Sequence, residues 1–129
     1  MKILAIDFDG TIVEDQFPDI GKMVPGAKEA INELYTMGYE IIIWTSRTHI
    51  RLLEAIEWLA KNGIKYHRIN ESSPAKLRMY GNKDTRKIFA EMYIDDRGLY
   101  PLPPWTEIIE IIRDRHPLYA DKVGREGFL

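Results

Sequence analysis

The chain has 129 residues, of which 45% are hydrophobic and 29% charged, so we expect one folded domain with an ordinary apolar core. It contains no cysteine, which excludes disulfides, thiolate metal sites and cysteine nucleophiles. A formal net charge of −2 argues against a strong electrostatic grip on nucleic acid, and no apolar run reaches membrane-spanning length. We therefore expect a cytoplasmic protein.

The first expected strand ends in two carboxylates. Residues 2–6 form a short apolar run typical of a strand buried in a parallel sheet, and Asp7 and Asp9 follow it. Because side chains alternate along a strand, both carboxylates should lie on one side, where they repel unless a cation or a proton compensates. Gly10 permits a sharp turn, and Thr11 adds a hydroxyl. This cluster suits a divalent metal beside a nucleophilic carboxylate.

Helical and strand patterns alternate along the rest of the chain. The expected elements, in chain order, are a helix between Gly26 and Gly38, a strand over 39–44, a helix over 48–61, a strand over 64–69, a strand over 92–94 and a helix over 105–115. This alternation predicts an α/β fold: a Rossmann-like three-layer helix–sheet–helix sandwich with a mainly parallel sheet. Residues 117–129 are a weakly patterned tail and are assigned no element.

Two further strand ends carry polar groups. The second strand is followed by Thr45, Ser46 and Arg47. A hydroxyl at the carboxyl end of a parallel strand can bind an anionic oxygen, although it can equally cap the next helix. Asp95 and Asp96 follow the strand over 92–94, and adjacent acids at the end of a buried strand are costly without a cation nearby.

A basic segment precedes those two acids. Residues 76–87 contain five Lys or Arg side chains and a single acid, Asp84. Such a run is usually a solvated loop. Beside an acidic pocket, we favour a role in attracting an anionic substrate.

The motif over residues 7–11, Asp-Phe-Asp-Gly-Thr, resembles the first motif of the haloacid dehalogenase-like phosphohydrolase superfamily. Alone, such a motif is also compatible with an acidic turn. Thr45 matches the second motif of that superfamily, Lys87 the third, and the pair Asp95-Asp96 the fourth, so the resemblance spans residues 2–97.

The third motif departs from the usual pattern. Ile88 stands where many members have a proline after the lysine. Lys83 and Lys76 are therefore alternatives to Lys87.

The resemblance implies a magnesium-dependent phosphatase that hydrolyses a phosphate monoester. Asp7 would attack phosphorus and form an aspartyl-phosphate, and Asp9 would act as general acid and base. Thr45 and Lys87 would bind the phosphoryl oxygens. The implied Mg2+ ligands are Asp7, the backbone carbonyl of Asp9, Asp95 and Asp96. The implied substrate-binding residues are Gly10, Thr11, Ser46, Arg47 and Arg97.

The segments after residue 11 and over 71–86 are too short to form an inserted cap domain, so we expect a single capless domain over residues 1–129 with an open site. An open site suits a large phosphorylated substrate, or a second copy of the chain acting as a lid in a homo-oligomer. We expect no membrane or nucleic-acid partner.

Two other functions are compatible with the same residues. A phospho-acceptor signalling domain uses a similar set, but there the acid pair follows the first strand, whereas here it follows the last. A catalytically silent binding module on the same fold is the second alternative.

Overall fold

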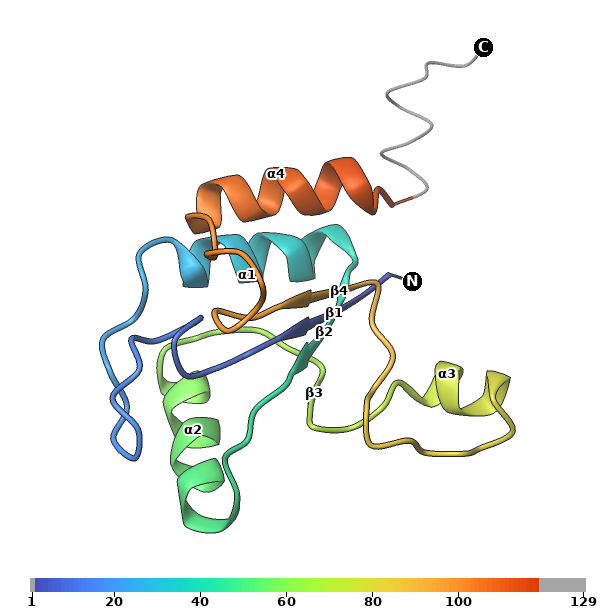
Figure 1. The fold of residues 1–129 in the computed structure, drawn as a ribbon, viewed down its shortest axis with the longest axis horizontal. Helices are drawn as coiled ribbons and strands as arrows, with labels where there is room; N and C mark the ends of the chain where they lie inside the picture. The colour runs from blue at the N-terminus through green and yellow to red at the C-terminus, as the bar shows by residue number, and fades with distance from the viewer. Residues whose placement is uncertain (1, 119–129) are drawn as a thin grey trace.

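The computed structural model describes residues 2–118, which form a four-stranded, fully parallel sheet with helices packed against it (Figure 1). The elements are β1 (Ile3–Ile6), α1 (Ala27–Met37), β2 (Glu40–Ile43), α2 (His49–Lys61), β3 (Arg68–Ile69), α3 (Pro74–Met79), β4 (Met92–Ile94) and α4 (Trp105–Arg115). The strand order is β3-β2-β1-β4. The α/β, Rossmann-like fold expected from the sequence is confirmed, with β1 between β2 and β4.

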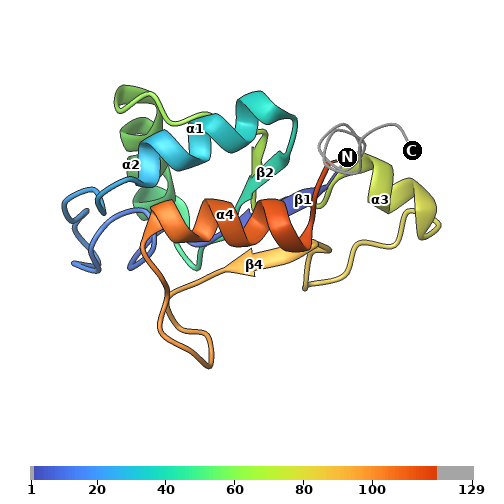
Figure 2. The ribbon, with the colours of Figure 1, turned by 90° about the horizontal axis from the view of Figure 1, so that it is seen from above.

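The two faces of the sheet are covered unequally. Leu4 and Ile6 of β1 belong to a large cluster that also holds buried side chains of α1, α2 and α4. Ile3 and Ala5 face the other way and join a small cluster that includes buried residues of segment 88–90. α3 contributes no buried residue, and it stands apart from α1 and α4 in both views (Figures 1 and 2). The third layer of the expected sandwich is therefore thin.

Local sequence signals account for the long helices. Gly38 ends α1 in a left-handed conformation with φ of 113°. The backbone N–H of Gly38 donates to the Tyr35 carbonyl and that of Tyr39 to the Leu34 carbonyl, both at 3.1 Å, which satisfies the last turn. The helices predicted between Gly26 and Gly38 and over 105–115 are confirmed, as is the strand over 92–94.

Two elements differ from expectation. The strand predicted over 64–69 pairs only at Arg68–Ile69. The backbone N–H of Ile41 in β2 donates to Nδ1 of His67 at 2.9 Å. The His67 side chain thus accepts the bond that a backbone carbonyl of β3 would otherwise accept, just before the β2–β3 pairing begins. α3 was not predicted, because a helix that buries no side chain has no apolar periodicity to detect.

Within residues 2–118, no helix has both the length and the apolar character required to cross a bilayer. Most of the tail assigned no element, residues 119–129, lies outside the described part of the chain.

Candidate active site

A cavity of about 290 Å3, here called the acidic cavity, lies at the carboxyl edge of the sheet. Its lining residues are Asp7, Asp9, Asp15, Phe17, Thr45, Ser46, Arg47, Asp95 and Arg97. They meet because the carboxyl ends of neighbouring parallel strands share one edge. The backbone N–H of Asp7 donates to the Ile94 carbonyl at 3.0 Å, which extends the β1–β4 pairing up to the aspartates. Asp15 and Phe17, from the loop after β1, were not predicted as site residues.

Three aspartates form a carboxylate cluster at this edge. Asp7, Asp95 and Asp96 each offer one oxygen within 4.8 Å of the others. Burial, the hydrogen bond to Asp96 and the charge of Asp95 raise the pKa of Asp7 to about 8. At neutral pH the cluster therefore retains a proton unless a cation replaces it. A set made only of carboxylate oxygens fits a hard divalent cation such as magnesium or calcium.

Thr11 holds two members of the cluster in place. Its side chain is buried, and its hydroxyl lies 3.1 Å from Oδ2 of Asp7 and 3.3 Å from Oδ1 of Asp96. The same hydroxyl accepts the backbone N–H of Asp96 at 3.1 Å. Trp105 donates through Nε1 to the Thr11 carbonyl at 3.0 Å. Thr11 was predicted to bind substrate, and in the structure its buried hydroxyl contacts two aspartates of the cluster.

Gly10 makes room for the cluster. Its φ is 90°, in the left-handed region, and a Cβ at this position would lie 2.1 Å from Oδ2 of Asp96. Any other residue would have to displace that carboxylate as well as adopt a strained backbone. Gly10 was predicted to bind substrate, and in the structure it leaves the space that the Asp96 carboxylate occupies.

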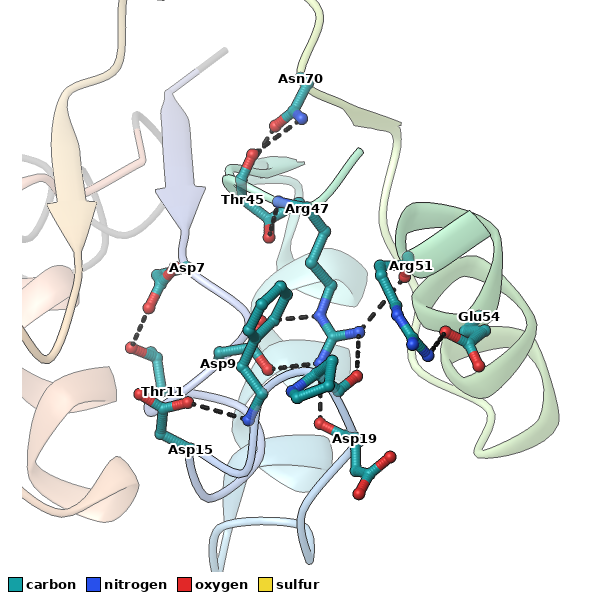
Figure 3. A network of polar contacts seen from close by, with 12 residues as sticks. Asp7, Asp9, Thr11, Asp15, Asp19, Thr45, Arg47, Arg51, Glu54 and Asn70 are labelled. Carbon is teal, nitrogen blue, oxygen red and sulfur yellow. Dashed lines mark hydrogen bonds and ion pairs between the residues drawn. The ribbon is translucent and has the colours of Figure 1, made fainter. Parts of the chain in front are cut away.

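Asp9 pairs with Arg47 instead of joining the cluster (Figure 3). Arg47 donates through Nε to Oδ2 of Asp9 at 2.7 Å and through Nη2 to Oδ1 at 2.8 Å. Its remaining N–H groups donate to the carbonyls of Pro18 at 3.2 Å, Asp19 at 2.9 Å and Arg51 at 3.3 Å. Since a guanidinium has five N–H groups, each one has an acceptor.

Arg47 lines the acidic cavity, but its N–H groups are taken up by acceptors of the protein. It is only 2% exposed, and the hydrogen bonds to Asp9 raise its pKa above the ordinary value. Its guanidinium also lies 5.4 Å from the Phe8 ring centroid and 5.1 Å from that of Phe17. With no N–H left for a substrate, Arg47 ties the loop of residues 14–22, here called the flap, to α2 and to Asp9.

Thr45 is held by a residue that the sequence did not reveal. Asn70 accepts the Thr45 backbone N–H and donates to the Thr45 carbonyl, both at 2.9 Å. The Thr45 hydroxyl oxygen accepts the backbone N–H of Arg47 at 3.1 Å and lines the cavity, as predicted for a residue at this strand end. The available signal for Asn70 was its place directly after the third predicted strand.

Ser46 and Arg97 are exposed residues of the cavity wall. The Arg97 side chain is 81% exposed, and its Nη2 lies 3.5 Å from Oδ2 of Asp15. Its backbone N–H donates to Oδ1 of Asp95 at 2.9 Å. Because Arg47 is buried and fully paired, Arg97 is the cation of this lining that can reach an incoming anion.

Lys87 does not line the acidic cavity, although it was predicted to bind the phosphoryl group. It precedes β4 whereas Asp95 follows β4, so the length of the strand separates them. Its ammonium lies 5.1 Å from the Tyr93 ring centroid and lines a second cavity. The alternatives Lys76 and Lys83 line that second cavity too. The described residues that line the acidic cavity include no lysine.

Comparison with solved structures gives a match over nearly the whole chain. The structure of a conserved protein from Bacteroides thetaiotaomicron superposes with a TM-score of 0.79 and 35% sequence identity. The match covers 93% of this chain and 95% of the Bacteroides chain. No protein-family model and no curated protein matches the sequence.

Proposed function

The chain belongs to the same family as that Bacteroides protein, and we propose that it is a metal-dependent phosphatase that hydrolyses phosphate monoesters. The observation that carries the proposal is the cluster of Asp7, Asp95 and Asp96, with three carboxylate oxygens within 4.8 Å of one another. Its position at the carboxyl edge of a parallel sheet is where open α/β folds bind ligands. The resemblance of residues 7–11 to the first haloacid dehalogenase-like motif specifies the reaction.

In this proposal Asp7, Asp95 and Asp96 hold the cation, which is Mg2+ by the family resemblance. A cation held there would supply positive charge for the phosphoryl group and would stabilise the ionised form of the three carboxylates. Gly10 and Thr11 support the cluster without contacting the substrate, since one leaves space for Asp96 and the other bonds to Asp7 and Asp96.

Asp7 is the proposed nucleophile. One of its carboxylate oxygens bonds to phosphorus while the bond from phosphorus to the leaving oxygen breaks, which gives an aspartyl-phosphate that water then hydrolyses. Asp9 donates a proton to the leaving oxygen and later accepts one from that water. Because both carboxylate oxygens of Asp9 accept N–H groups of Arg47, this role requires the Asp9 carboxyl group to leave that pair and take up a proton before it meets the leaving oxygen.

Thr45 and Arg97 are the proposed binding groups for the phosphoryl oxygens. Thr45 lines the cavity, and the two hydrogen bonds with Asn70 fix its backbone. Arg97 provides a positive charge at the wall where the family pattern led us to expect a lysine. The flap is too short to form a cap domain over this cavity, so we propose that a large substrate or a second copy of the chain covers the site.

One observation favours a second candidate, the catalytically silent binding module. The lining of the acidic cavity lacks the lysine that the resemblance led us to expect, and a module that only binds has no need of one. A module of this kind would bind a divalent cation at the carboxylate cluster but would release no phosphate.

Phosphate release from p-nitrophenyl phosphate, and then from a panel of phosphorylated metabolites, tests the proposal. We expect release with Mg2+ and none with a chelator. Calorimetry with Mg2+ alone should accompany the assay. Cation binding without turnover on any substrate would establish the silent module, and no cation binding would overturn both candidates.

A further inference from the structure

A second cavity of about 720 Å3, here called the lysine cavity, lies between α3, the segment over 83–90 and β4. It is on the thin face of the sheet, and it shares no lining residue with the acidic cavity. Its volume is within the usual range for sites that enclose a small organic ligand. The basic segment over 76–87 contributes much of its wall.

The charge of this cavity is all of one sign. Lys76, Lys83 and Lys87 line it, and no carboxylate is among its described lining residues. The nearby carboxylate of Asp84 accepts a hydrogen bond from the Ser72 hydroxyl at 2.8 Å. Three ammonium groups around one cavity favour a ligand with more than one negative charge.

Aromatic rings form the other part of the wall. Tyr80 is 55% exposed, Phe89 38% and Tyr93 39%, high values for large rings. Lys76 lies 4.4 Å from the Phe89 ring centroid and Lys87 5.1 Å from that of Tyr93. Two of the cations thus rest on ring faces, a weak interaction that an anionic ligand can replace.

We propose that the lysine cavity is a binding site for a mononucleotide. The lysines pair with the phosphate, and the base stacks on the exposed rings. Inorganic phosphate would use only the charges, and an apolar ligand only the rings. The three lysines surround one cavity, and the chain as a whole has a net charge of −2. This arrangement fits one nucleotide better than an extended polynucleotide. The proposal does not depend on the phosphatase reaction.

The first test uses the wild-type chain, so that folding of a variant is not at issue. We would titrate 15N-labelled protein with AMP in the presence of a chelator, which keeps metal out of the acidic cavity. We expect backbone shifts at Leu77, Phe89 and Ala90. Absence of shifts, or shifts confined to Ser46 and Arg97 of the acidic cavity, would overturn the proposal.

The second test compares two double variants of exposed lysines. Lys83→Gln with Lys87→Gln should raise the Kd for AMP at least tenfold, whereas Lys61→Gln with Lys65→Gln, outside the cavity, should leave it unchanged. Phe89→Leu, which removes a ring and keeps an apolar side chain, should raise the Kd several-fold. Equal effects of the two double variants would contradict the site.

Two further ligands define the chemistry. Inorganic phosphate should bind at least tenfold more weakly than AMP, because it cannot use the rings. Phosphate binding as tight as AMP would overturn the stacking role. A single-stranded oligonucleotide of n nucleotides offers n places to bind. If its Kd were lower than that of AMP by a factor greater than n, the cavity would be part of a polynucleotide-binding surface and not a mononucleotide site.

Discussion

Asp7 is the residue at which a proton and the proposed cation would compete. Its pKa of about 8 lies far above the ordinary 3.8 because the carboxyl group is buried and stands beside Asp96 and Asp95. The raised pKa favours the protonated form in the metal-free folded state. A bound cation removes that preference by compensating the negative charge of the cluster.

The first prediction concerns pH and the stability of the metal-free protein. Because folding raises the Asp7 pKa, its stabilising contribution is complete below about pH 4 and is lost as pH rises through about 8. We expect urea unfolding in chelator to show a free energy of unfolding that falls between about pH 5 and about pH 8, because this range lies between the ordinary and the raised pKa of Asp7. Asp7→Asn should remove much of that fall, and Asp19→Asn, an exposed flap carboxylate, should not. Parallel declines in all three proteins would contradict this account.

The second prediction separates space from backbone strain. Gly10 and Gly81 both have positive φ, of 90° and 67°, but a Cβ would meet Asp96 at Gly10 and nothing within 4 Å at Gly81. Substitution by Ala at either site should cost about 1 kcal/mol or more of unfolding free energy. Only Gly10→Ala should also weaken Mg2+ binding in a calorimetric titration. Equal affinities in the two variants would show that the cluster does not need the space.

At the scale of elements, Arg47 links the flap, α2 and Asp9. The partner Asp9 is 38 positions away in sequence, and the Arg47 side chain is 1% exposed. A buried guanidinium with every N–H group accepted stabilises its surroundings mainly because its removal leaves those acceptors and a carboxylate unpaired.

The third prediction follows from that arrangement. Arg47→Ala should lower the unfolding free energy by about 3 kcal/mol and speed proteolysis within the flap. Arg51→Ala is the matched control, because Arg51 forms an exposed ion pair with Glu54 and should cost less than about 1 kcal/mol. Chemical denaturation and limited proteolysis of both variants provide the measurements. A flap as resistant in Arg47→Ala as in the control would contradict the proposed link.

The elements and the site were predictable to different degrees. α1, α4 and β4 follow from apolar periodicity and glycine or proline signals, and the aspartates at strand ends follow from the topology. The Asp9–Arg47 pair could not be foreseen, because which acceptors surround a buried side chain depends on loops distant in sequence. Lys87 was assigned because it precedes the strand before Asp95 at the interval that the resemblance implies, but in the structure it lines the lysine cavity and not the acidic one.

The whole molecule has one well-packed face and one thin face. α1, α2 and α4 share the large cluster, whereas α3 buries nothing. Regions with few buried apolar contacts open at low free-energy cost. The lysine cavity lies in this less constrained part, and the acidic cavity lies at the edge of the central strands.

The fourth prediction tests this asymmetry by native-state hydrogen exchange. Backbone amides of α3 should exchange far faster than those of α1, whose buried residues Ala27, Ala30, Ile31 and Leu34 belong to the main core. Mass spectrometry of peptic peptides from the two helices would measure the difference. Equal protection of the two helices would contradict the view that α3 is weakly packed.

The most direct test of the proposed reaction is the Mg2+-dependent rate of phosphate release by Asp7→Asn beside that of Asp19→Asn. Both changes replace one carboxylate by an amide, but only Asp7 lines the acidic cavity. A neutral amide cannot attack phosphorus, so the account predicts that Asp7→Asn falls to the rate of buffer alone while Asp19→Asn keeps the wild-type rate. Substantial turnover by Asp7→Asn would contradict the assignment of Asp7 as the nucleophile.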